Sequence, residues 1–89
     1  MRASVKARVN ALTEWSKSNP LKVWRQSQLG DMGVRTAAGL LEVNVSTVQA
    51  WERGSARPTE ESLQRIGQLI QAPNIQKQWD EWLEERPTV

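Results

Sequence analysis

The sequence predicts an all-α protein, a bundle of about five to six short helices in a single domain over residues 1–89. Three observations lead to this prediction. Apolar residues recur at intervals of three and four, the spacing of one face of an α-helix. Proline, glycine and asparagine separate the segments that carry this spacing, as expected of short connections between helices. No segment alternates apolar and polar residues over a useful length, so we expect no β-sheet.

The first two predicted helices cover residues 3–18 and 20–29. The apolar face of the first helix comprises Val5, Val9, Leu12 and Trp15, with basic residues on its flanks. Proline at position 20 disfavours helix in the residue before it and suits a first helical turn. A second helix is therefore expected to begin there, with Asn19 as its cap and Gly30 as its stop.

A helix, a tight turn and a second helix are predicted over residues 34–54. The first helix, over 34–41, is expected to bury Ala37, Ala38, Leu40 and Leu41. Three residues connect it to a helix over 45–53, for which Asn44 is expected to supply a side-chain cap. Gly54 follows, and glycine readily adopts the left-handed conformation that ends a helix. This arrangement is typical of a helix-turn-helix unit.

Two further helices are predicted in the last third of the chain. Thr59 can cap a helix over residues 60–71, whose first turn carries two glutamates. Asn74 is expected to cap a final amphipathic helix within residues 74–86. Its apolar face comprises Ile75, Trp79, Trp82 and Leu83. That face either completes the chain's own core or forms an interface with a second copy or a partner protein. The N-terminal helix is a second candidate for such an interface or for extra core, and the sequence leaves these uses open.

The composition excludes several classes of protein. The chain has no cysteine and no histidine, which excludes disulfides and the usual zinc sites and favours a cytoplasmic location. It has no glycine-rich phosphate loop and no credible acid–base pair, so we expect no enzymatic activity, no metal and no cofactor. No apolar run approaches the roughly 20 residues of a membrane-spanning helix, so we expect no membrane association.

The charge of the chain is uneven. The net charge is +2, but residues 74–89 contain two basic and four acidic residues. Residues 1–73 are left with ten basic and six acidic residues, a local charge of +4. The basic part can face a polyanion while the acidic end faces away, and a charge of this size is also ordinary for a protein surface.

The helix over 45–53 has two different faces. Val48 and Trp51 lie three residues apart on one face. The other face presents Ser46, Gln49, Ala50 and Arg53. A helix that is held by two large apolar side chains and presents small polar groups suits insertion into a groove. Because the major groove of DNA admits a bare α-helix, double-stranded DNA is the expected partner.

The segment from Ala38 to Gly54, followed by Arg57 and Pro58, resembles the Cro and phage-repressor (XRE) family of helix-turn-helix domains. The shared features are an alanine in the first helix, a Ser-Thr-Val start to the second, Trp-Glu-Arg-Gly at its end and a following proline. The resemblance covers about residues 20–71. It implies a repressor-like fold of five helices and a bacterial or phage transcription regulator.

The resemblance also implies roles for individual residues. The side chains near base edges would be Val45, Ser46, Gln49 and Ala50, and those near phosphates would be Arg35, Thr47, Arg53 and Arg57. Gln49 can donate and accept together, which suits adenine, while Val45 and Ala50 can contact a thymine methyl group. Glu52 would pair with Arg25 of an earlier helix and so position the recognition helix.

Three positions depart from the family pattern. Glu42 stands where the family usually has glycine, and a positive φ there would cost glutamate on the order of 1 kcal/mol or more. Val34 stands where a DNA-contacting glutamine is common. The connection at residues 30–33 is about two residues longer than usual.

Each interpretation has an alternative. Ser46 and Thr47 also suit the first turn of any helix, Gln49 can be a solvated surface residue, and Arg53 can serve the helix end. Glu52 can be an unpaired surface residue.

Two functions are considered for the whole chain. The first is a sequence-specific DNA-binding regulator that acts as a homodimer on half-sites about one DNA turn apart. The second is a phage or bacterial adaptor that uses the same fold chiefly to bind a protein partner, such as host machinery or a component of DNA packaging or partition. This idea is motivated by the N-terminal helix and by the tryptophans of the final helix.

Overall fold

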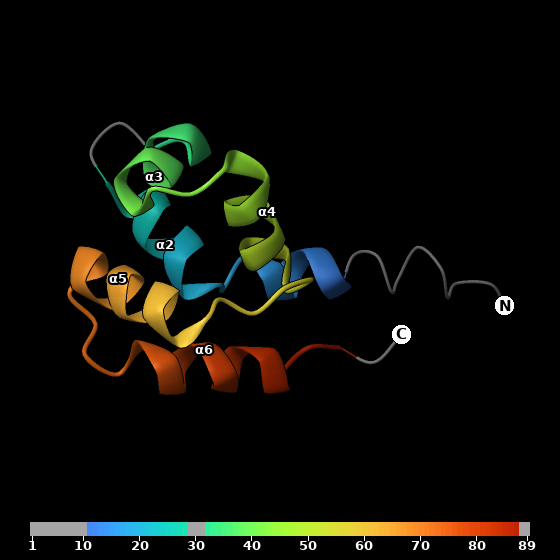
Figure 1. Cartoon of the computed structure of the whole chain (residues 1–89). Helices are drawn as coiled ribbons and strands as arrows, with labels where there is room; N and C mark the ends of the chain where they lie inside the picture. Colours follow the sequence, from blue (N-terminus) through green and yellow to red (C-terminus); the bar gives the residue numbers. More distant parts are fainter. Residues whose placement is uncertain (1–10, 29–31, 88–89) are drawn as a thin grey trace, which may run out of the picture.

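The computed structural model describes residues 11–28 and 32–87. Within these residues the protein is all-helical, which confirms the predicted fold class at that level. Residues 11–16 are helical and are followed by α2 (Pro20–Ser27), α3 (Val34–Leu41), α4 (Val45–Arg53), α5 (Glu60–Ile70) and α6 (Ile75–Glu84) (Figure 1). The predicted apolar positions Val5 and Val9 and the predicted stop at Gly30 lie outside the described residues.

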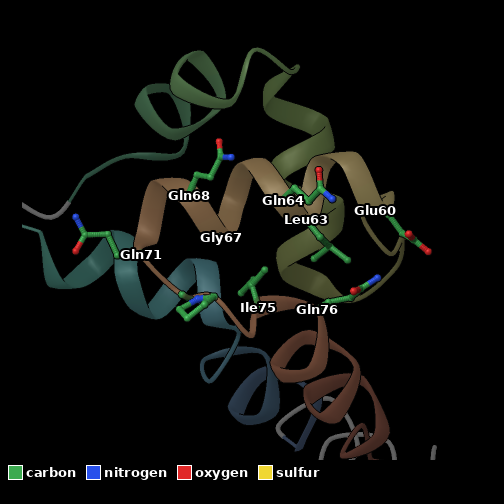
Figure 2. Close-up of a pocket in the computed structure, with 10 residues that line it drawn as sticks. Glu60, Leu63, Gln64, Gly67, Gln68, Gln71, Ile75 and Gln76 are labelled. Atoms are coloured by element: carbon green, nitrogen blue, oxygen red, sulfur yellow. The ribbon is translucent and has the colours of Figure 1, made fainter.

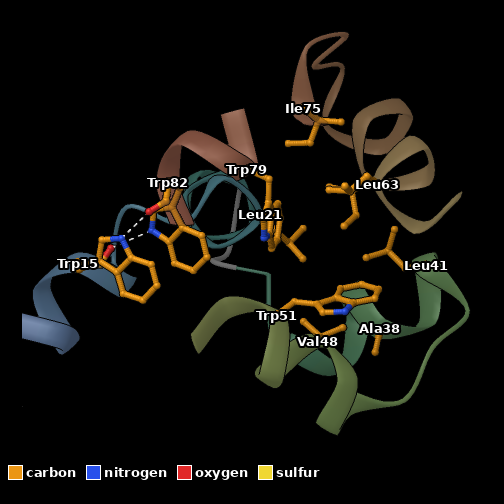
Figure 3. Packing of buried hydrophobic residues seen from close by; sticks show 11 residues of the cluster. Trp15, Leu21, Ala38, Leu41, Val48, Trp51, Leu63, Ile75, Trp79 and Trp82 are labelled. Carbon is orange, nitrogen blue, oxygen red and sulfur yellow. Dashed lines mark hydrogen bonds between the residues drawn. The ribbon is translucent and has the colours of Figure 1, made fainter. Parts of the chain in front are cut away.

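The helices pack as two pairs, which are joined by contacts between α3 and α5. α3 packs against α4, and α5 lies beside α6, while α2 contacts both α5 and α6 (Figure 1). The core between them is formed mainly by Leu21, Leu41, Val48, Trp51, Leu63, Ile66, Ile75 and Trp79 (Figure 3). Every labelled helix contributes to this core, as a chain of this length requires if it is to bury enough apolar surface.

The buried face of α3 is narrower than predicted. Ala37, Ala38 and Leu41 are buried, as expected, but the prediction for Leu40 was wrong because 53% of this residue is exposed. Leu40 is one residue, or about 100° of helical rotation, away from Leu41. With Leu41 facing the core, Leu40 faces solvent.

Two of the four predicted asparagine and threonine caps are present. The Asn19 side chain accepts a hydrogen bond from the Lys22 amide, and Thr59 accepts one from the Ser62 amide. The predicted side-chain caps at Asn44 and Asn74 were wrong. Asn74 has φ −104° and ψ 29°, which is not the extended conformation of a capping residue. Asn44 is extended and exposed, and α4 begins with backbone bonds to its carbonyl rather than to its side chain.

The ends of α3 and α4 both use the left-handed conformation. Gly54 has φ 76°, as predicted, and a side chain at this position would collide with the Trp15 ring. Glu42 has φ 59° at the end of α3. The turn therefore keeps the geometry that favours glycine, and glutamate occupies it at an energetic cost.

Replacing Glu42 with glycine should stabilise the protein by up to about 1 kcal/mol, because glycine adopts this φ without steric strain. The free energy of unfolding, measured by urea titration, checks this. Gln64→Gly, at an exposed helical position of α5, is the matched control and should destabilise the protein by about 0.5–1 kcal/mol. If Glu42→Gly loses as much stability as the control, the positive φ at Glu42 is not a source of strain.

Two tryptophans join the segment at residues 11–16 to α6. The Trp15 and Trp82 rings stack with their centroids 4.1 Å apart and their planes at 5°. Each indole N–H donates to the backbone carbonyl of the other residue, at 2.7 Å from Trp15 and 3.1 Å from Trp82 (Figure 3). Trp79 meets Trp82 edge-on at 5.8 Å.

This packing bears on the two uses considered for the apolar face of the last helix. Ile75, Trp79 and Trp82 are all buried in the chain's own core, and Leu83 is partly buried against it. The interpretation of these residues as a dimer or partner face gains no support from this packing, because the core accounts for most of their apolar surface. A small chain needs its largest apolar side chains for its own core, and α6 supplies three of them.

Candidate nucleic-acid interface

A tight turn joins α3 to α4. The turn at residues 42–44 is tight, since the Val43 amide donates to the Ala38 carbonyl at 3.0 Å and the Glu42 amide donates to that of Gly39 at 3.2 Å. α3 and α4 pack directly against each other. The result is a helix, a tight turn and a second helix, at the residues where the sequence predicted them.

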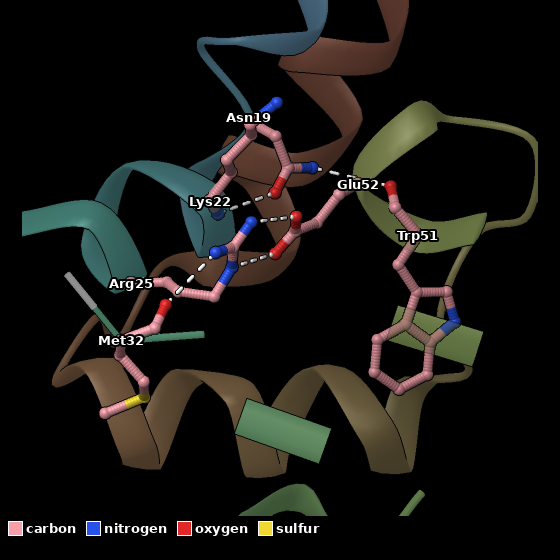
Figure 4. Close-up of polar contacts among 6 residues, drawn as sticks. All are labelled: Asn19, Lys22, Arg25, Met32, Trp51 and Glu52. Carbon is pink, nitrogen blue, oxygen red and sulfur yellow. Dashed lines mark hydrogen bonds and ion pairs between the residues drawn. The ribbon is translucent and has the colours of Figure 1, made fainter. Parts of the chain in front are cut away.

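The inner face of α4 is anchored in the core. Val48 is fully buried and Trp51 is 5% exposed (Figure 3). The Trp51 carbonyl also receives a hydrogen bond from the Asn19 amide group at 3.5 Å. Because Asn19 also caps α2, this contact ties the start of α2 to the last turn of α4 (Figure 4).

A buried ion pair holds α4 to α2. Arg25 Nε donates to Glu52 Oε2 at 2.9 Å, and Arg25 Nη2 donates to Glu52 Oε1 at 2.7 Å (Figure 4). The two side chains are 10% and 7% exposed. Arg25 Nη1 also donates to the Met32 carbonyl, which lies just before α3. The predicted pairing of Arg25 with Glu52 is confirmed, and its bidentate geometry restricts the rotation of α4 relative to α2.

The predicted base-contacting residues differ in their exposure. Ser46 and Gln49 are exposed, Ala50 is half-buried, and Val45 is half-buried and packs against the core. The Gln49 side chain makes no hydrogen bond to any described residue, so its amide is available to a ligand. Val45 has less surface to offer than predicted, because it is the first residue of α4 and helps to close the turn onto the core.

The predicted phosphate-contacting residues also fall into two groups. Arg35, at the start of α3, and Arg53, at the end of α4, are exposed and form no ion pair with any described residue. Thr47 is half-buried in the first turn of α4.

Arg57 has a partner that the sequence did not reveal. Its Nε and Nη2 donate to the two carboxylate oxygens of Asp80 on α6, at 2.7 and 3.2 Å. This hydrogen bonding raises the pKa of Arg57 and lowers the pKa of Asp80 from its ordinary value. Arg57 would have to leave this carboxylate in order to contact a phosphate.

A groove of about 630 Å³ lies between α5 and α6, and none of its described lining residues belongs to α4 (Figure 2). Four glutamines, Gln64, Gln68, Gln71 and Gln76, line it together with apolar side chains, and Glu60 is its one charged lining residue. No group of three potential ligands that could hold a metal ion occurs among the described residues. Nothing in this lining resembles the paired groups of an acid–base site.

No protein-family model, curated protein or solved structure matched this chain in comparisons. Within the described ranges, none of the helices has the length and apolar character needed to span a lipid bilayer.

Proposed function

We propose that this chain is a sequence-specific double-stranded-DNA-binding protein, a transcription regulator of bacterial or phage type, that inserts α4 into the major groove. The observation that carries the proposal is the two-sided construction of α4. Val48, Trp51 and Glu52 fix its inner face to the rest of the molecule, while Ser46 and Gln49 stand exposed on the other side. A rigidly held helix with free polar side chains can place those side chains against base edges reproducibly.

The exposed side chains supply both kinds of contact that DNA recognition needs. The Gln49 amide can form a bidentate pair with adenine, and Ser46 can donate or accept. Arg35 and Arg53, at the start of α3 and the end of α4, suit phosphate oxygens on either side of the groove. Since only one long polar side chain faces the bases, DNA shape and phosphate contacts would contribute much of the recognition.

Replacing Gln49 with alanine should relax the base preference at one position of the bound sequence, at a cost of roughly 1–3 kcal/mol for the preferred base. Selection of bound sequences from random duplexes, with the native chain and the variant in parallel, measures the preference. Gln68→Ala, which removes an exposed glutamine from α5, should leave it unchanged. An identical preference in the native chain and Gln49→Ala would exclude Gln49 from base contact.

Replacing Asp80 with asparagine should release Arg57 and strengthen binding to every duplex alike. One additional phosphate contact should steepen the slope of log K against log salt by about 0.9. Titration of a fluorescent duplex at several salt concentrations gives both quantities. Glu61→Gln is the matched control, because it frees Arg65 on α5 by an equal change of charge. If the two variants change DNA affinity and its salt dependence alike, Arg57 makes no phosphate contact of its own.

The adaptor function has less support than it had from the sequence. Of its two motivations, the tryptophans of the last helix are accounted for by the core, and the N-terminal helix lies in part outside the described residues. A titration that detects no binding to any duplex at low salt would overturn the DNA-binding proposal.

A further inference from the structure

A second groove, of about 430 Å³, lies where α2, the end of α5 and α6 meet. Its apolar lining comes from Pro20 and Val23 on α2, Ile70 on α5 and Trp82 on α6. Val23 is 50% exposed and is one of two large apolar side chains that stand out in solvent among the described residues. The groove therefore offers an apolar floor that the described part of the chain does not cover.

The charge at this groove has a single sign. Among the described residues that line it, Glu81 and Glu85 are the charged ones, and both are exposed. Neither forms an ion pair with a described residue, whereas Glu14, Glu52, Glu61 and Asp80 all do. Glu81 lies on α6, and Glu85 is the residue that caps its end. Because the Glu85 amide still donates to the Glu81 carbonyl, the two residues are about one helical turn apart on the same side. A complementary ligand would carry two cations at a similar spacing and a small apolar side chain between or beside them.

The first ten residues of the same sequence have this composition. They contain Arg2, Lys6 and Arg8 and no acidic residue. Arg2 and Lys6 are four residues apart, as are Val5 and Val9. Within the described residues, Lys17, Arg25, Arg57 and Arg65 have carboxylate partners and Arg86 lies over the Trp15 ring. The other described cations, Lys22, Arg35, Arg53 and Lys77, form no ion pair with a described residue.

We propose that the acidic groove binds the first ten residues of a second copy of this chain, so that two copies exchange these segments around a two-fold axis. Reciprocal exchange fills two grooves with one complementary pair of surfaces, as in an isologous dimer. Exchange doubles the contact that a single groove supplies, and specific dimers bury more surface than small one-sided contacts. The site is separate from α4, so the exchange does not depend on DNA binding.

The test is the oligomeric state of the full chain, measured by sedimentation equilibrium without DNA. We expect the native chain to dimerise, with an affinity that falls as salt rises. Combining Glu81→Lys with Glu85→Lys should weaken the dimer by about tenfold or more, because like charges then face each other. Glu84→Lys makes the same type of change at an exposed position of α6 that does not line the groove, and it should leave the dimer intact.

A charge exchange makes the test independent of folding defects. A chain carrying Arg2→Glu and Lys6→Glu should dimerise about tenfold or more weakly than the native chain, as should the chain carrying Glu81→Lys and Glu85→Lys. An equimolar mixture should form a heterodimer, because each segment then meets a groove of opposite charge. The proposal would be overturned if the native chain stays monomeric up to about 1 mM. This outcome includes the case in which the first residues of a chain cover the groove of that same chain. A dimer that both variants retain would overturn it as well. Neither result bears on DNA binding, which is measured separately.

Discussion

Replacing Glu52 with alanine should lower the free energy of unfolding by about 3–5 kcal/mol, the cost of leaving one partner of a buried ion pair without the other. Arg25 is 10% exposed at its side chain and would lose both of its carboxylate contacts. Small proteins have about 5–15 kcal/mol of stability in total, so much of the population would unfold on mild heating. Urea unfolding followed by circular dichroism measures the loss.

The matched control replaces both partners. Arg25→Met combined with Glu52→Leu removes the charges together and keeps apolar volume at the site, so it should be close to neutral or stabilising. If the double variant is as unstable as Glu52→Ala, the loss reflects packing rather than an uncompensated charge. The DNA affinity of the folded double variant is then compared with that of the native chain. A lower affinity would show that the bidentate ion pair positions α4 in addition to stabilising the fold.

Replacing Trp82 with alanine should cost about 3–5 kcal/mol, since it removes a large buried ring and leaves a cavity. Loss of the stacked Trp15 ring contact adds about 0.5–1.5 kcal/mol. The same change leaves the Trp15 carbonyl without the indole donor that it now has. The loss is measured as a lower thermal midpoint and a lower free energy of unfolding.

Two comparisons make this result specific. Trp82→Phe keeps an aromatic ring and should recover most of the stability, whereas Val23→Ala, at an apolar residue that is 50% exposed, should change stability by no more than about 0.5 kcal/mol. If Trp82→Ala is as mild as Val23→Ala, then α6 is not part of the core. In that case an external role for its tryptophans would have to be reconsidered.

The helices could be predicted from the sequence because their signals are local. Three- and four-residue spacing of apolar side chains located every labelled helix, and Asn19, Gly54 and Thr59 marked three of their ends. Capping at Asn74 could not be predicted, since it depends on a backbone conformation that the preceding connection imposes. Which of the adjacent apolar residues Leu40 and Leu41 is buried depends on how α3 is rotated against its neighbours.

The site was predictable where one helix supplies it and less so where distant residues meet. The two faces of α4 follow from periodicity alone, and they agree with the burial of Val48 and Trp51. The Arg25–Glu52 pair was expected only from a family resemblance. Arg57 and Asp80 are 23 residues apart in the sequence. Several other acidic residues could equally well be the partner of Arg57 as far as the sequence shows. Only the packing of α6 brings these two together.

The central claim, that α4 recognises a DNA sequence in the major groove, is tested most directly by selecting bound molecules from a pool of random duplexes with the purified full chain. The proposal predicts enrichment of a defined motif, palindromic if two copies bind together, with one position that loses its preference in Gln49→Ala. Recovery of a random pool, together with no measurable affinity for duplex DNA at low salt, would contradict it.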